Sequence, residues 1–160
     1  MDSFVLLRND EKLFIDKINS IDANEIDGYG SSLLQNAIAE GKIAAAMVLV
    51  DRGADIDFQD KDGKTPLHYA LIFGITAVSE KLIQIGANVN IKDKHGNNAI
   101  WVALLNNGKI NMYLLPSLLN AGADSHSVNV YNKSTLDIVR QMNLKELNEI
   151  FGLASNSESK

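Results

Sequence analysis

One pattern recurs along this chain at an interval of 33 residues, and it limits the possible folds more than any other feature. A glycine followed by a polar and then an apolar run begins at Gly30, Gly63 and Gly96. A related run begins 36 residues later, at Asn132. A second mark, Gly-Ala-Asp or Gly-Ala-Asn, lies ten residues before each of the last three starts. A fixed period of about 33 residues predicts a repeat solenoid, in which similar units stack in a row.

The central copy indicates that each unit is helical. Thr65 precedes Pro66, and its hydroxyl can cap a helix whose first turn tolerates proline, because that N–H would be unpaired there anyway. A short apolar run then ends at Gly74 and a second ends at Gly86. Glycine adopts the left-handed backbone that terminates a helix at least cost. We therefore expect an antiparallel helix pair in each unit.

The tetrad Thr65-Pro66-Leu67-His68, with its flanking glycines, resembles the ankyrin repeat. The resemblance covers residues 20–153 and implies an all-α ankyrin-repeat α-solenoid of stacked helix-turn-helix units with projecting hairpin fingers. In that family the imidazole in the slot of His68 forms hydrogen bonds between neighbouring repeats. Trp101 occupies the equivalent slot of the third repeat, where we expect it to pack.

The period predicts a single ankyrin-repeat domain over residues 1–153. Residues 1–20 read as a degenerate N-terminal half repeat, which fits a cap because the terminal units of a stack must present a solvated face. The remaining segments are repeats at about 24–56, 57–89, 90–125 and 126–153, and a polar tail at 154–160.

The third repeat departs from the pattern. An additional residue lengthens the turn at 106–108, and two more fall in the second helix, which is expected over Ile110–Asn120 and carries Pro116. A proline inside a helix costs about 3 kcal/mol unless the helix breaks there, so we expect a kink or a restart near Leu115. The insertion is either tolerated on the convex side or reshapes a partner-binding surface.

Composition and charge exclude several classes of function. A chain with 46% hydrophobic residues can bury a core without a metal or a disulfide, and its lack of cysteine fits a reducing cytosol. No signal peptide is apparent, and the longest apolar run, Ile43–Val50, is too short to span a membrane. A net charge of −5 argues against nucleic acid as a partner. We expect a cytoplasmic protein, monomeric when unbound, with no membrane or nucleic-acid partner.

No motif predicts catalysis, a cofactor or a metal. Gly63-Lys64-Thr65 lacks the upstream glycine and strand of a phosphate-binding loop. The three histidines are not spaced as metal ligands, and no serine lies in a nucleophile elbow. An enzyme is therefore the least favoured interpretation.

A stack of this kind offers an open concave surface, which members of the family use to bind other proteins. Tyr69, Ile72 and Phe73 fall at helical spacings of three and four, so they predict an apolar stripe that faces a partner and is ringed by charge. Alternatively, Ile72 or Phe73 packs against the neighbouring repeat. The partner-binding residues expected from the family's variable slots are Tyr29, Lys61, Asp62, Lys64, Tyr69, Ile72, Phe73, His95, Asn97, Leu105, Asn106 and Tyr131.

The sequence thus predicts a non-catalytic protein–protein interaction module. Its small size, with no fused domain, favours a stoichiometric inhibitor or specific binder that acts sterically. One version is a bacterial immunity protein or antitoxin that neutralises a cognate toxin. An injected effector, or an adaptor or scaffold, would use the same surface.

Overall fold

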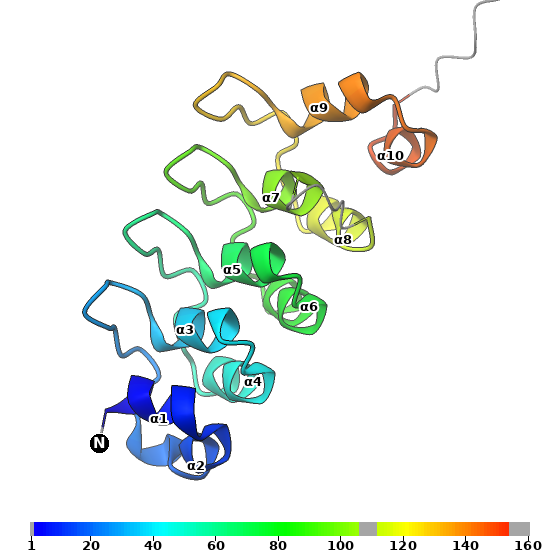
Figure 1. Cartoon of the computed structure of the whole chain (residues 1–160). Coiled ribbons are helices and arrows are strands. Elements are labelled where there is room, and N and C mark those ends of the chain that lie inside the picture. The colour runs from blue at the N-terminus through cyan, green and yellow to red at the C-terminus, as the bar shows by residue number, and fades with distance from the viewer. Residues whose placement is uncertain (1, 106–111, 154–160) are drawn as a thin grey trace, which may run out of the picture.

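The computed structural model describes residues 2–105 and 112–153. These residues form a row of antiparallel helix pairs, and a long loop joins each pair to the next (Figure 1). The pairs stack in chain order, which confirms the predicted all-α solenoid. The helices are α1 (Ser3–Asn9), α2 (Glu11–Asp16), the 3₁₀ helix η1 (Ile18–Ser20), α3 (Leu33–Ala39), α4 (Ile43–Asp51), α5 (Pro66–Phe73), α6 (Thr76–Gln84), α7 (Ala99–Leu105), α8 (Leu115–Asn120), α9 (Thr135–Met142) and α10 (Lys145–Ile150).

Reciprocal hydrogen bonds fix where three of the helices begin. At α5 the Thr65 hydroxyl accepts a bond from the backbone N–H of His68, and the His68 ring accepts one from the backbone N–H of Thr65. This capping box satisfies N–H groups that the first turn of a helix leaves unpaired. The same pair of bonds joins Ser32 with Gln35 at α3 and Ser134 with Asp137 at α9.

The helices end where the sequence predicted left-handed residues. Gly74 has φ +68° at the end of α5, and Gly41 has φ +69° between α3 and α4. In the last unit Asn143, with φ +48°, takes this position. Asparagine is the residue other than glycine that most readily adopts this conformation.

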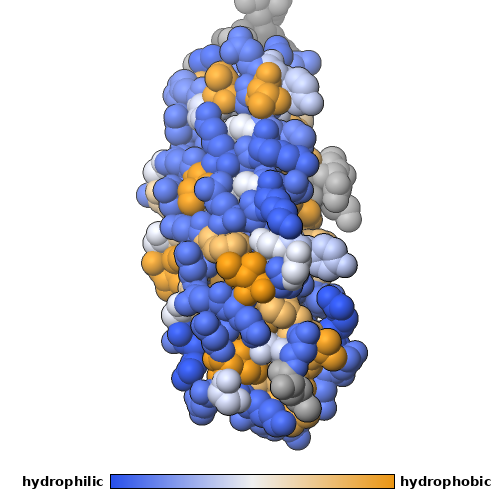
Figure 2. Space-filling model, turned by 90° about the vertical axis from the view of Figure 1, so that its left-hand side faces the viewer, coloured by the Kyte–Doolittle hydropathy of each residue, from blue (hydrophilic) through white to orange (hydrophobic). Residues whose placement is uncertain are grey.

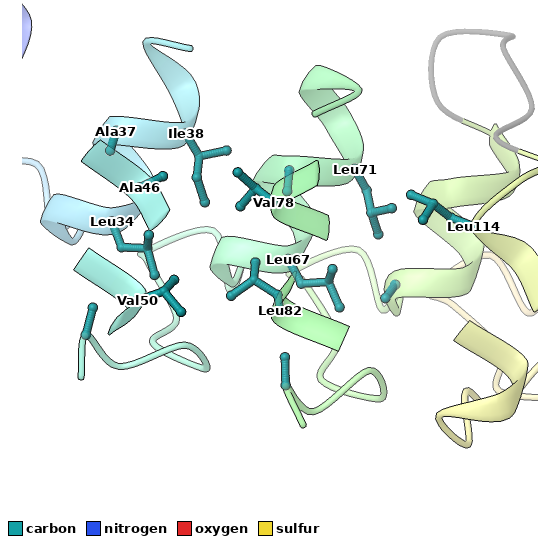
Figure 3. Packing of buried hydrophobic residues seen from close by; sticks show 14 of the residues in the cluster. Leu34, Ala37, Ile38, Ala46, Val50, Leu67, Leu71, Val78, Leu82 and Leu114 are labelled. Atoms are coloured by element: carbon teal, nitrogen blue, oxygen red, sulfur yellow. The ribbon is translucent and has the colours of Figure 1, made fainter. Parts of the chain in front are cut away.

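The core lies between successive helix pairs and continues along the row (Figure 3). Side chains of one pair point at those of the next, so no pair buries its apolar face alone. The buried residues labelled in Figure 3 are Leu34, Ala37, Ile38, Ala46, Val50, Leu67, Leu71, Val78, Leu82 and Leu114.

Four long loops project from the same side of the row (Figure 1), and we call them the first to fourth fingers. They span residues 22–32, 55–65, 88–98 and 124–134. Backbone hydrogen bonds join neighbouring fingers: Lys94 N donates to Asp62 O at 2.8 Å, and Val130 N donates to His95 O at 2.9 Å. In each finger one side chain accepts bonds from the N–H groups two and four residues on, namely Asp27, Asp60, Asp93 and Asn129.

The N-terminal segment, predicted as a degenerate half repeat, forms the helix pair α1 and α2. Leu7 and Phe14 are buried in the same core as the repeats. Glu11 of α2 also caps its neighbour, since its Oε1 accepts a bond from Ala45 N at 3.1 Å. Among the described residues, the side chain of Lys42, the N-cap residue of α4, forms no capping bond. The segment therefore covers one end of the stack and supplies a missing helix cap.

In the third repeat, a helix begins at the point near which Pro116 predicted a kink or a restart. Helix α8 begins at Leu115, and Pro116 lies in its first turn, where a missing N–H costs nothing. The predicted lengthened turn, and the first part of the helix expected from Ile110, lie outside the described residues. The polar tail predicted at 154–160 also lies outside them.

Candidate protein-binding surface

Helices α3, α5, α7 and α9 each follow a finger directly, and we call them the inner helices. On α5 the rings of Tyr69 and Phe73 stack, with centroids 6.2 Å apart and planes inclined by 26°. Phe73 is 53% exposed, whereas Tyr69 and Ile72 are half-buried. Phe73 therefore has the most solvent-exposed side chain of the three residues in the predicted apolar stripe. The spacing of four residues explains the stack, because such residues lie on the same face of a helix.

Tyr69 connects its helix to the second finger. Its hydroxyl donates a hydrogen bond of 2.7 Å to Oδ2 of Asp60. Burial, together with this bond to a carboxylate, raises the pKa of Tyr69 to about 12, so the phenol remains a donor at neutral pH. The tyrosine therefore holds the finger against the inner helix, and this fixes the ring on which Phe73 stacks.

A charged cluster bridges the second and third fingers. Oδ2 of Asp62 lies 2.9 Å from Nζ of Lys64, and Oδ1 of Asp62 lies 2.8 Å from Nζ of Lys94. Hydrogen bonds from Lys94 and Lys64 lower the pKa of Asp62 to about 2, and the Asp62 carboxylate raises the pKa of Lys94. Two cations share one anion, so the cluster carries one net positive charge. Exposed pairs of this kind add little stability, about 0–1 kcal/mol each.

Two predicted residues take part in contacts between fingers. The Asn97 carbonyl oxygen lies 3.1 Å from Nε2 of His68, and Oδ1 of Asn97 accepts a bond of 3.1 Å from Nδ2 of Asn129. The bond to His68 is the inter-repeat contact that the family resemblance implied. The side chain of Lys61 lies over Gly30 of the first finger. A Cβ added to Gly30 would lie 2.9 Å from Cε of Lys61. Both residues therefore join neighbouring units.

The other predicted residues are spread along the row. Tyr29 is 84% exposed in the first finger, Tyr131 is exposed in the fourth, and His95 is exposed in the third. Leu105, at the end of α7, is half-buried and packs against the core. Asn106 lies outside the described residues.

Seen from the side of the fingers, the molecule is mostly hydrophilic, and apolar groups are set among the charged ones (Figure 2). Two such groups lie near the top, at the C-terminal end of the row. Three exposed apolar side chains of the fingers, Ile26, Val128 and Val130, were not among the residues predicted from the sequence. The sequence did contain a signal for Ile26 and Val128, because the equivalent position is polar in the other two fingers. It holds Gln59 in the second finger and a lysine in the third.

A metal-binding cluster and a membrane-spanning helix are both absent from residues 2–105 and 112–153. No three His, Asp or Glu side chains gather there in a way that could hold a metal ion. His68 is buried, and burial lowers its pKa, so it is neutral and serves as a cap rather than as an exposed base. No helix in these residues has the length and apolar character needed to cross a membrane.

The family comparison agrees with the architecture. A family profile described as "Ankyrin repeats (3 copies)" matches residues 7–93, which is more than half of the 160 residues. No curated protein matches the chain. The matched segment runs from α1 to the third finger, and the structure continues the same helix pairs and fingers beyond it.

Proposed function

Because this chain belongs to the ankyrin repeat family, we propose that it is a non-catalytic module that binds one partner protein through its fingers and inner helices. Ankyrin repeats generally mediate protein–protein interaction. The observation that supports this surface is Phe73, a large apolar side chain that lies 53% exposed on an inner helix. Burying a side chain of this size is worth about 1.5–3 kcal/mol relative to leaving it in water.

The surroundings of Phe73 favour an interface anchor. Its ring is held on one side by Tyr69, which is itself fixed by the hydrogen bond to Asp60. The charged cluster of Asp62, Lys64 and Lys94 lies in the neighbouring fingers. An aromatic side chain held in a rigid setting is typical of a binding hot spot. Little rotamer freedom would be lost when a partner docks.

We further propose that binding is steric and stoichiometric. The fingers are joined to one another by backbone bonds between Lys94 and Asp62 and between Val130 and His95, so the surface is formed before a partner arrives. Preformed interfaces change their backbone little on binding. A protein that docks in this way blocks its partner, as an inhibitor or a bacterial immunity protein does. An adaptor that recruits many partners is the second candidate.

Affinity capture from the native cell tests the proposal. The full chain would carry a tag, and bound proteins would be identified and quantified by mass spectrometry. Phe73→Glu places a charge at the proposed anchor, and Ile85→Glu is the matched control. Ile85 is 43% exposed and directly follows α6, the second helix of the same pair, so it does not lie on an inner helix. Circular dichroism and the midpoint of urea unfolding would show whether both variants keep the fold.

We expect one partner in a ratio near one to one, which is lost with Phe73→Glu and retained with Ile85→Glu. Losing an anchor of this kind costs at least about 2 kcal/mol, or roughly a thirtyfold weaker Kd. Many partners in small amounts would favour an adaptor instead. Equal capture by both variants would show that Phe73 is not part of the interface.

A further inference from the structure

A hollow of about 350 Å³ lies between α1 and the first finger, at the N-terminal end of the row. Its walls come from Asp2, Phe4, Val5 and Arg8 on one side and from residues 25–29 on the other. The predicted partner-binding residues include no residue of α1. Tyr29 is the one residue of the first finger among them. A volume of this size is enough to enclose one long side chain.

The hollow exposes apolar surface that the stack does not use. Val5 is 51% exposed on α1, Ile26 is 50% exposed in the first finger, and Tyr29 is 84% exposed beside it. The second finger has Gln59 and Asp62 in the slots of Ile26 and Tyr29. The fourth finger has Val128 and Tyr131 in these slots, so the apolar character is shared by the first and fourth fingers and is not required to build a finger.

The charges around this apolar surface are mainly negative. Asp2, Glu25 and Asp27 contribute three carboxylates, and Arg8 contributes the one positive charge of the lining. That charge is already matched, because Nε of Arg8 lies 3.1 Å from Oε1 of Glu40, outside the lining. The hollow as a whole thus attracts a cation.

The three carboxylates are not equivalent. Asp27 is committed to its own finger, since it accepts bonds from Tyr29 N and Ser31 N through one oxygen and from the Asn36 side chain through the other. One oxygen of Asp2 caps α1 through bonds from Phe4 N and Val5 N. Within the part of the chain that the structure describes, the Glu25 carboxylate forms no ion pair. Glu25 is therefore the group best placed to meet a new cation.

We propose that this hollow receives an arginine or lysine side chain of the partner protein. The aliphatic stem lies against Val5 and Ile26, as the stems of long basic side chains do on apolar surfaces. The cationic head pairs with Glu25 and approaches the exposed ring of Tyr29. Acidic side chains are repelled, and a purely apolar side chain leaves the carboxylates without a counter-ion. This proposal rests on the proposed function, because it assumes that the ligand side chain belongs to a protein.

Nuclear magnetic resonance of the full, ¹⁵N-labelled chain tests the hollow without knowledge of the partner. The probes are the peptides acetyl-Gly-Arg-Gly-amide and acetyl-Gly-Lys-Gly-amide, and the control is the same peptide with citrulline, which has the shape of arginine but no charge. We expect the basic peptides to shift the amides of residues 4–8 and 25–29 at millimolar concentrations, and more weakly as salt is added. Citrulline is expected to cause much smaller shifts.

Variants assign the contact to its residues. Glu25→Gln keeps the shape of the side chain and is expected to weaken the apparent Kd for the arginine peptide about threefold to fivefold, the range of an exposed ion pair. Ile26→Ser is expected to weaken both basic peptides by removing the apolar wall. Equal shifts with arginine and citrulline, shifts elsewhere on the chain, or no effect of Glu25→Gln would each overturn the proposal.

The same measurement separates this proposal from the proposed function. Phe73 lies on α5, outside the lining of the hollow, so Phe73→Glu must leave the shifts caused by the arginine peptide unchanged. If the peptide binds but no partner is captured from the cell, the proposed function fails and the hollow stands. If a partner depends on Phe73 while the peptides do not bind, only the hollow is wrong.

Discussion

Replacing Gly96 by alanine tests whether contacts between fingers stabilise the solenoid. Gly96 has φ +77°, and a Cβ built there would lie 3.0 Å from Cα of Asn129 and 3.1 Å from N of Val130. Both atoms belong to the backbone of the fourth finger, so they cannot move aside as a flexible side chain would. The two fingers must separate, and the bond of 2.9 Å from Val130 N to His95 O lies at the point of contact.

The structure gives the size of the effect. A left-handed backbone costs an L-residue about 1–2 kcal/mol relative to glycine. Loss of the bond between Val130 and His95 adds about 0.5–1.5 kcal/mol. We therefore expect Gly96→Ala to lower the free energy of unfolding by about 1.5–3.5 kcal/mol.

Gly86→Ala is the matched control. Gly86 has φ +88°, yet a Cβ there would meet no described atom within 4 Å beyond its chain neighbours, so this variant carries the backbone strain alone. Urea unfolding followed by circular dichroism would measure both variants, and we expect Gly96→Ala to be less stable than the control by about 0.5–1.5 kcal/mol. Amide hydrogen exchange at Val130 should accelerate in Gly96→Ala only. Equal losses of stability and unchanged exchange would refute the idea that the fingers support one another.

Three further predictions concern single side chains. The hydroxyl of Thr135 is buried and has no partner among the described residues, so Thr135→Val should raise the free energy of unfolding by about 1 kcal/mol in urea unfolding. Burial lowers the pKa of His68 in the folded state, so the stability that its neutral ring contributes should be full above pH 6.5, the ordinary pKa, and decline as pH falls below it. His68→Gln should remove this part of the pH dependence, because an amide side chain does not titrate. The variant should keep the fold, since Gln35 in the equivalent slot makes both the capping bond and the inter-repeat bonds. Tyr69→Phe should lower stability by about 1 kcal/mol through loss of the bond to Asp60, and a calorimetric scan would measure it.

The repeat architecture followed from local signals. Capping residues such as Thr65 and left-handed glycines such as Gly74 act within a few residues of themselves, so their spacing predicted the helix pairs directly. The turn between α1 and α2 uses Asp10 rather than a glycine. Its side chain caps α2 by accepting a bond from Leu13 N.

The surface was harder to predict, because it depends on how the fingers fold back on the helices. The sequence placed Tyr69 and Phe73 on one face of a helix, but it did not reveal the bond from Tyr69 to Asp60, nine residues earlier in another element. The same spacing joins Asn36 to Asp27 in the first repeat, so the pattern existed in the sequence. The hollow beside α1 could not be predicted, since it requires the helix and the first finger to be placed in space.

A photo-crosslinking experiment tests most directly whether the partner docks on the inner helices. A chain with p-benzoylphenylalanine in place of Phe73, and a second chain with the same residue in place of Ile85, would be irradiated in the native cell. Both positions are exposed, so both probes reach the solvent. If Phe73 anchors the interface, position 73 crosslinks to one partner protein and position 85 does not crosslink to that protein. A partner crosslinked from position 85 and not from position 73 would contradict this docking surface.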